Sequence, residues 1–402
     1  MTELSNDPVV IVGCARTPMG SFQGELAALT APQLGAAAIK AALERAGVDP
    51  QSVDEVLMGC VLPAGQGQAL ARQASLGAGL PLSAGCTTVN KMCGSGMRAA
   101  MAAHDMLLAG SVETVVAGGM ESMTNAPYLL PKARAGLRIG HTMMYDHMML
   151  DGLEDAYDRL PNGGGKPMGG YGEDCADKYH FTREQQDAFA SASVSRARAA
   201  AESGALQWEI TPVTVPGKAG DTVIDSDEGP HRIKLENIPK LKPAFKKDGT
   251  VTAASSSSIN DGAAALVMMR ESAAKAKGLK PLARILGHAS HAQAPGWFTT
   301  APIGAIEKLL KKIGWKAGEV ELREINEAFA VVPMAAMHDL GIAHEKVNVH
   351  GGACAVGHPI GASGARIMVT LMGALRKRGL RKGVASLCIG GGEATAIALE
   401  ML

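Results

Sequence analysis

Aromatic residues are scarce in this sequence. They make up 3% of its 402 residues, whereas hydrophobic residues make up 47%, so the interior must be built mainly from Ala, Val, Leu, Ile and Met. The formal net charge is zero, and no excess of either sign favours nucleic acid or an anionic membrane as a partner. No stretch approaches the roughly 18 apolar residues of a membrane span, and residues 1–13 lack the pattern of a signal peptide. We therefore predict a cytoplasmic protein without a membrane partner.

Paired cysteines are also lacking. The chain has seven cysteines and no C-x-x-C motif, which argues against a disulfide framework and predicts no zinc or other metal site. A cysteine taken alone is most often a small buried side chain. The seven are Cys14, Cys60, Cys86, Cys93, Cys175, Cys354 and Cys388.

Glycine, in contrast, is abundant, with 49 residues, and this fits an α/β protein with many tight turns. Short apolar runs alternate with helical patterns over residues 9–117 and again over residues 259–399. The alternation predicts a mainly parallel sheet with both faces covered by helices. Between residues 123 and 256 the alternation is lost around one clear helix at 183–201, which indicates an inserted loop domain.

Two segments far apart in the chain repeat each other. Residues 95–98 and 363–366 both read S-G-x-R, each at the start of a predicted helix, and the strands that follow end in glycine pairs. Such turns also recur in unrelated α/β proteins. The repeat predicts two related halves whose helix starts meet at one shared cleft, where ligands usually bind.

Cys93 is the first candidate for chemistry. It lies between a predicted strand and the N-terminus of a predicted helix, flanked by Gly94 and Gly96. The helix dipole and free N–H groups at such a position stabilise a thiolate and would lower the pKa of the thiol. The two glycines leave room for a substrate carbonyl. The alternative is a thiol packed into a tight turn.

Three further side chains could act with Cys93. His358 lies in a glycine-rich turn and could take the Cys93 proton, although a single histidine is more often structural. Cys388 ends a predicted strand and presents a second thiol. Asn326 could hold a water or donate to an oxyanion, with a helix N-cap as the alternative, and Glu327 could orient a base. The remaining histidines that we considered, with His288 and His291 placed in a loop, are interpreted as structural.

Four blocks together resemble the thiolase family. They read N-K-M-C-G-S-G-M at 90–97, N-E-A-F-A at 326–330, G-H-P-I-G-A-S-G-A-R at 357–366 and C-I-G-G-G at 388–392, and the resemblance runs from residue 11 to the C-terminus. It implies a thiolase-like five-layered α-β-α-β-α fold of two similar halves, and assembly into a homotetramer. The implied parts are an N-terminal half at 1–122 plus 258–279, a C-terminal half at 280–402, and a loop domain at 123–257 for tetramerisation and coenzyme A binding.

The resemblance also implies an activity. It is acetyl-CoA C-acetyltransferase, the reversible Claisen condensation of two acetyl-CoA to acetoacetyl-CoA and coenzyme A through an acyl-cysteine, with no metal and no cofactor besides these substrates. Cys93 would be the nucleophile, His358 would activate it, and Cys388 would exchange the α-proton. His358 and a water held by Asn326 would form one oxyanion hole, and the N–H groups of Cys93 and Gly390 the other.

Contacts to coenzyme A and the acyl group are implied as well. Pro167-Met168-Gly169 stands where family members often read His-Met-Gly, and residues 254–257 read A-S-S-S where many read G-N-A-S. Phe298 stands where many members carry smaller or Met side chains, and we hypothesise that it caps the acyl pocket and favours short chains. The implied contact residues are Leu153, Met168, Arg232, Phe245, Ala254, Ser257, Phe298, Ala328 and Phe329.

Other enzymes on this fold use different residues. Ketoacyl synthases use Cys with two His, and 3-hydroxy-3-methylglutaryl-CoA synthases use Cys, His and Glu, whereas Asn326 and Cys388 favour a thiolase. Two alternatives stay open at this point. One is a broad-chain 3-ketoacyl-CoA thiolase of fatty-acid β-oxidation. The other is a catalytically idle acyl-CoA-binding relative, although an idle binder has no physical need for two positioned thiols.

Overall fold

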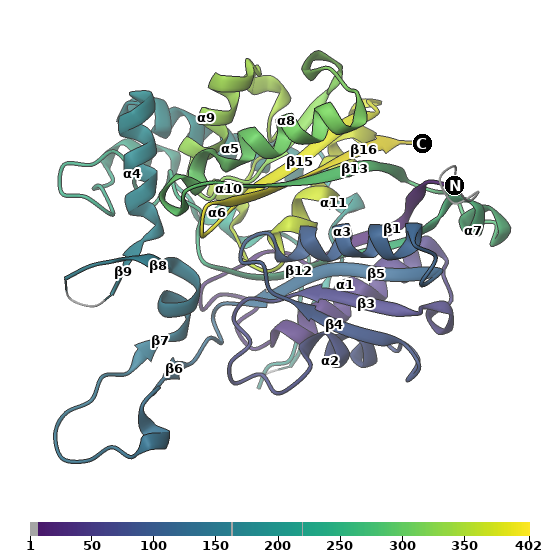
Figure 1. Cartoon of the computed structure of the whole chain (residues 1–402), viewed down its shortest axis with the longest axis horizontal. Helices are drawn as coiled ribbons and strands as arrows, with labels where there is room; N and C mark the ends of the chain where they lie inside the picture. The colour runs from purple at the N-terminus through teal and green to yellow at the C-terminus, as the bar shows by residue number, and fades with distance from the viewer. Residues whose placement is uncertain (1–6, 162–163, 219) are drawn as a thin grey trace.

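The fold is a stack of five layers, shown in Figure 1 as a computed structural model that describes residues 7–161, 164–218 and 220–402. Helices α1 and α2 cover the outer face of one sheet, and α8 and α9 lie on the outer side of the other. Helices α3 and α11 pack against each other between the two sheets. The predicted five-layered α-β-α-β-α fold is therefore confirmed. The bounds are α1 Ala31–Ala46, α2 Leu70–Gly77, α3 Ser95–Leu108, α8 Ala301–Ile313, α9 Val331–Leu340 and α11 Ser363–Arg378.

The two sheets meet at one narrow join. The N-terminal half has the strand order β4-β3-β5-β12-β1, the C-terminal half has the order β14-β15-β16-β13, and β1 pairs with β13 through two residue pairs. A two-residue strand, β2 (Gly20–Ser21), pairs with β12. The bounds are β1 Val9–Arg16, β3 Glu55–Gly59, β4 Gly85–Val89, β5 Thr114–Ser122, β12 Asn260–Arg270, β13 Ala283–Ala292, β14 Leu322–Ile325, β15 Lys382–Ile389 and β16 Glu393–Met401.

The strand directions differ from the prediction of a mainly parallel sheet, which is wrong. Parallel pairing occurs between β3 and β4, between β3 and β5, and between β14 and β15. The other pairings of the two sheets are antiparallel. The reason is local: β15 and β16 form a hairpin around residues 390–392, and β12 returns from the insertion to run antiparallel beside β5 and β1.

The segment between β5 and β12 leaves the central sheets. Its described strands form three two-stranded sheets, and its helices pack on the flank of the molecule (Figure 1). The bounds that we predicted for the loop domain, 123–257, and for the two halves stay a prediction. The strands are β6 Tyr128–Leu129, β7 Tyr145–Asp146, β8 Glu154–Arg159, β9 Gly165–Pro167, β10 Val213–Val215 and β11 Thr222–Ile224, and the helices are α4 Met168–Tyr179, α5 Arg183–Glu202 and α6 Glu228–Arg232.

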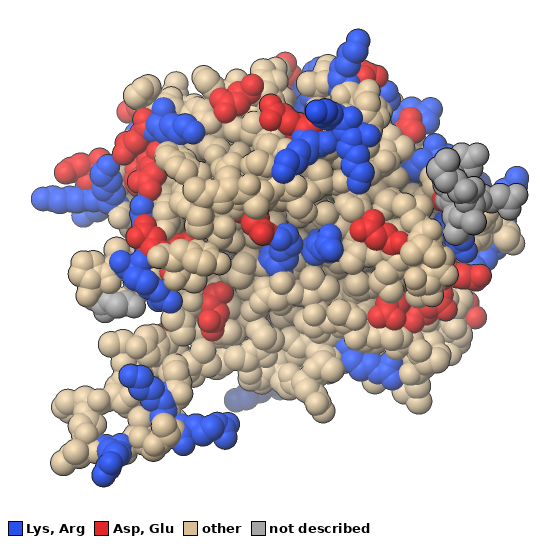
Figure 2. Space-filling view, in the orientation of Figure 1, with Lys and Arg blue, Asp and Glu red and all other residues tan. Residues whose placement is uncertain are grey.

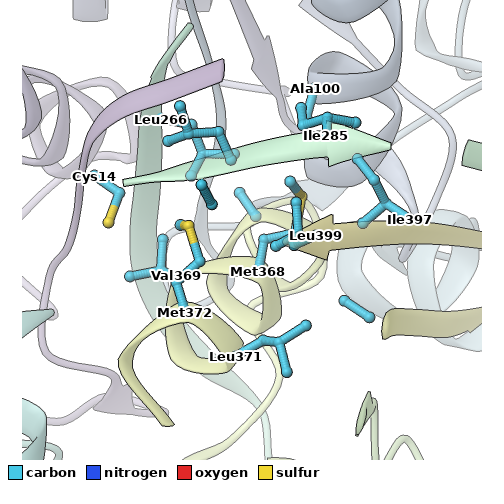
Figure 3. Close-up of a cluster of buried hydrophobic side chains, with 14 of the residues drawn as sticks. Cys14, Ala100, Leu266, Ile285, Met368, Val369, Leu371, Met372, Ile397 and Leu399 are labelled. Carbon is cyan, nitrogen blue, oxygen red and sulfur yellow. The ribbon is translucent and has the colours of Figure 1, made fainter. Parts of the chain in front are cut away.

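The core explains why α11 stays in place. Residues 363–375 are all buried, because sheets and α3 surround the helix. Figure 3 shows Met368, Val369 and Met372 of α11 among side chains from β1, β12, β13 and β16. This cluster joins both halves and is built of aliphatic and sulfur-containing side chains, as the scarcity of aromatic residues predicts. Among the described helices, none is long and apolar enough to cross a membrane.

Candidate active site

The starts of α3 and α11 pack backbone to backbone. A Cβ atom at Gly96 would lie 2.9 Å from the Ala365 nitrogen, and one at Gly364 would lie 2.4 Å from the Met97 nitrogen. Only glycine allows this approach. The two S-G-x-R segments therefore meet, and they bring Cys93 and His358 to one pocket of about 270 Å³.

Cys93 sits on a strained and locked turn. The preceding Met92 has φ 46°, a left-handed conformation that is costly for a side chain of this size. The Ser95 hydroxyl accepts a hydrogen bond from the Lys91 N–H (2.8 Å) and donates one to the Met92 carbonyl (2.6 Å). Lys91 also forms an ion pair with Glu393, which ties this turn to the start of β16. The turn directs the partly buried thiol into the pocket.

The electrostatics of Cys93 differ from the prediction. Burial raises the pKa of the thiol to about 11, although the N–H groups of Gly390 and of Cys93 itself lower it, while the charge of Glu121 raises it further. The predicted lowering by the helix N-terminus is therefore wrong for the free protein, because desolvation outweighs the N–H groups. The same two N–H groups face the sulfur, where an oxyanion hole for acyl transfer is needed.

This pKa gives a measurable expectation. Between pH 7 and pH 10 the rate constant for alkylation of Cys93 by iodoacetamide should rise about tenfold per pH unit, because only the thiolate reacts and its fraction grows in that proportion below the pKa. Peptide mass spectrometry after timed quenching measures the fraction of Cys93 that is alkylated at each pH. The partly buried Cys86 serves as an internal control. If the alkylation rate constant of Cys93 instead levelled off near pH 8, the pKa of this thiol would be lowered, as the sequence predicted.

His358 is held as a neutral base. Its Nδ1 lies 2.5 Å from the Ser363 hydroxyl, which donates to the Pro359 carbonyl at 2.9 Å. The hydroxyl must then accept from Nδ1, so Nδ1 carries the proton and Nε2 has the lone pair. Burial, with a contribution from the charge of Arg366, lowers the pKa of His358 to about 3. Nε2 is buried and has no hydrogen-bond partner among the residues that the structure describes.

The Asn326 side chain has a fixed orientation. Arg366 Nη2 donates to its Oδ1 at 3.3 Å, and since a guanidinium has no acceptor, the oxygen must face Arg366. The amide nitrogen is then directed away from Arg366, and it too is buried, with no partner in the described part of the chain. A water bound between this nitrogen and the pocket would satisfy it. The N-cap alternative does not hold, because α9 begins at Val331 and Ala330 is its N-cap.

Cys388 is close to Cys93 and less accessible. It lies in β15 and is almost fully buried. Burial raises the pKa of its thiol well above the ordinary value, and the charge of Cys93 adds to this, while its own N–H acts in the opposite direction. The two thiols would repel each other only if both were ionised, and Cys388 does not itself line the pocket.

Glu327 does not orient the histidine. It accepts hydrogen bonds from Ser193 (2.7 Å), Asn348 (2.8 Å) and the Cys354 N–H (3.0 Å). These contacts join α5 to the loops around residues 348–354. Our hypothesis that Glu327 orients a base is not supported by these contacts, which are structural.

The implied substrate contacts divide into two groups. Leu153, Met168, Ser257, Phe298, Ala328 and Phe329 line the pocket, together with Gly390. Ala254 does not line it, and Phe245 packs edge to face on Phe329 with ring centroids 5.9 Å apart. The structure does not bring Arg232 to the pocket: its side chain in α6 is 61% exposed and pairs with Glu228 at 2.6 Å.

Sequence reasoning missed the residues that position the catalytic groups. Ser363 and Arg366 belong to the repeated S-G-x-R segment, so a signal for them was present. Glu121 accepts N–H donors from Val61 (2.9 Å) and Gly361 (2.7 Å) and so joins β5 to the turn that carries His358. Residues 154–157 also line the pocket, and nothing in their sequence indicates this.

Comparison with known proteins gives consistent matches over the whole chain. The family model "Thiolase, N-terminal domain" matches residues 9–272, and "Thiolase, C-terminal domain" matches residues 279–401. Acetyl-CoA acetyltransferase 2 of Arabidopsis thaliana is 53% identical, with 98% of this chain and 97% of that protein covered. Acetyl-CoA acetyltransferase of Allochromatium vinosum is 47% identical, with 99% and 100% covered. The crystal structure of the Bacillus anthracis acetyl-CoA acetyltransferase matches with a TM-score of 0.95 at 41% identity, covering 98% of this chain and 99% of that one.

Proposed function

This chain belongs to the thiolase family, and on that basis we propose that it is an acetyl-CoA acetyltransferase, which condenses two acetyl-CoA to acetoacetyl-CoA and coenzyme A and catalyses the reverse thiolysis. The observation that carries the proposal is the unpartnered Nε2 of neutral His358 in the same pocket as the Cys93 thiol. The names of the similar proteins support the same reaction. The chain supplies every acid, base and nucleophile, so no cofactor besides the two thioesters enters the scheme.

In the acylation step, Cys93 gives its proton to His358 Nε2, and the sulfur attacks the carbonyl carbon of the first acetyl-CoA. The tetrahedral oxyanion accepts hydrogen bonds from the N–H groups of Cys93 and Gly390, and one such donor is typically worth about 3 kcal/mol. Cleavage of the bond to the coenzyme A sulfur leaves acetyl-Cys93. Because His358 keeps the proton from Cys93, the leaving thiolate takes its proton from Cys388.

In the condensation step, the Cys388 thiolate removes an α-proton from the second acetyl-CoA. While Cys93 is acetylated it cannot ionise, so no charge on Cys93 opposes formation of the Cys388 thiolate. The enolate oxygen accepts hydrogen bonds from protonated His358 and from a water held by Asn326. The enolate carbon then attacks acetyl-Cys93 to form acetoacetyl-CoA, and Cys93 recovers its proton from His358.

The assembly is part of the proposal. A loop at residues 130–144 projects from the body, and Figure 2 shows only basic charges on this projection. Four apolar side chains of this loop are exposed: Leu137, Ile139, Met143 and Met144. Exposed apolar surface of this kind commonly marks a protein–protein contact. We propose that these loops join the subunits of a homotetramer in the cytoplasm. Light scattering of the purified chain measures its mass.

Substrate range decides between this function and β-oxidation. We expect thiolysis of acetoacetyl-CoA to be much faster than thiolysis of 3-ketohexadecanoyl-CoA, because Phe298 is buried at the pocket and packs edge to face on Tyr171, 5.9 Å between ring centroids. Coupled measurement of kcat/KM for both substrates tests it. Comparable values would assign the chain to the broad-chain class, and no activity on either would favour an idle binding protein.

Phe298→Ala should then shift the preference. We expect kcat/KM for 3-ketohexanoyl-CoA to rise about tenfold relative to acetoacetyl-CoA, since the pocket gains room for the added methylenes. Phe245→Ala is the matched control, because Phe245 packs behind Phe329 and does not line the pocket. A Phe298→Ala protein no better than wild type on the longer substrate would contradict the capping role.

A further inference from the structure

Three side chains able to bind a metal converge where the two halves meet. His104 and Asp105 lie in α3 of the N-terminal half, and His288 lies in β13 of the C-terminal half, not in a loop as the sequence predicted. Asp105 Oδ1 is 3.2 Å from His104 Nδ1 and 2.9 Å from His288 Nε2. One carboxylate oxygen therefore bridges two imidazoles from segments far apart in the chain.

The spacing suits a small divalent ion. Zinc binds histidine nitrogen and carboxylate oxygen at about 2.0–2.2 Å, so two ligand atoms on a tetrahedral ion lie about 3.4 Å apart. The two measured separations are a few tenths of an ångström below this value, and all three ligand atoms lie within 4.8 Å of one another. The two rings already stand edge to face, with centroids 5.0 Å apart. Small side-chain movements would admit the ion.

Burial and hydrogen bonding act in opposite directions in this cluster. Burial lowers the pKa of both His104 and His288, and the hydrogen bonds to Asp105 oppose this. Burial opposes ionisation of Asp105, but hydrogen bonds from His288 and His104 outweigh it and lower the pKa of the carboxyl. Metal binding requires only that each ring shift its proton to the other nitrogen. Lys312 and Arg98 face the cluster and limit the affinity.

We propose that His104, Asp105 and His288 bind one divalent transition-metal ion of the zinc type, with water as the fourth ligand, and that this ion clamps α3 to β13. An ion can enter from solvent, because the Asp105 side chain is 55% exposed, while the two histidine side chains are 10% exposed. The site is structural, not catalytic: His104 lies about 14 Å along α3 from Ser95, where the helix begins just after Cys93. The proposal is independent of the acetyltransferase function.

The test uses the full-length, tag-free chain with Cys93→Ser, which removes the accessible thiol from metal binding. Calorimetric titration with Zn²⁺ should give one ion per chain, and Co²⁺ should produce a visible d–d absorption band. Saturating Zn²⁺ should raise the thermal midpoint by a few degrees. No binding by this parent protein would overturn the proposal.

Variants then locate the ion. His104→Gln and His288→Gln should lose the Co²⁺ band, and Asp105→Asn, at a half-exposed position that tolerates change, should bind Zn²⁺ at least tenfold more weakly. His338→Gln is the matched control, since exposed His338 and its neighbour Asp339 form a similar pair, 2.8 Å apart, without a second imidazole in the contact. An equal Zn²⁺ response in His104→Gln, Asp105→Asn and His338→Gln would place the ion elsewhere and refute the site.

Discussion

Replacing Cys93 with serine is expected to lower kcat for acetoacetyl-CoA thiolysis by about 10⁴-fold or more. A hydroxyl is a far weaker nucleophile than a thiol and a much weaker acid, so it gives its proton to His358 far less readily than Cys93 does. The covalent intermediate should disappear at the same time. Intact-protein mass spectrometry after incubation with acetyl-CoA should show one added acetyl group on wild type and none on Cys93→Ser.

Cys86→Ser is the control for this experiment. Cys86 is a free, partly buried thiol in the edge strand β4 and does not line the pocket. This variant should acetylate and turn over like wild type. If Cys93→Ser kept more than a tenth of wild-type kcat, the nucleophile would have to be another thiol, with Cys388 the nearest candidate.

The nucleophile could be predicted largely because Cys93 is flanked by Gly94 and Gly96 at the start of a predicted helix. Gly96 and Gly364 stand where two helix starts touch, and both occupy the second position of the repeated S-G-x-R segments. The repeat of these starts likewise predicted two halves and a shared site. The sequence therefore predicted that Cys93 and His358 lie at one cleft, but not their separation or orientation.

Other properties depend on elements that are distant in sequence. The sign of the Cys93 pKa shift follows from how deeply the closed pocket desolvates the thiol, and no local pattern records that depth. Antiparallel pairing of β12 follows from the path that the chain takes through a long insertion. Asp105 and His288 are 183 positions apart in the sequence, so no short sequence motif could predict their contact.

Substituting His358 with glutamine is expected to lower kcat by about 10²–10⁴-fold, with little change in KM for acetoacetyl-CoA. Glutamine fills a similar volume but cannot take the Cys93 proton. His350→Gln is the matched control. His350 is another buried histidine, whose pKa burial and the charges of Arg378 and Lys377 lower to about 4, and it does not line the pocket. The His350→Gln variant should retain a kcat close to that of wild type.

A pH series separates proton transfer from a merely structural role of His358. At high pH the Cys93 thiolate forms without a base, since the pKa of this thiol is about 11. The acylation step of His358→Gln, followed as acetyl transfer from acetyl-CoA to Cys93, should therefore recover about tenfold per pH unit between pH 8 and pH 10. Wild-type acylation should change much less over the same range, because neutral His358 already accepts the proton. A defect of constant size across this range would show that the substitution had disturbed the turn at 357–363 instead of removing a base.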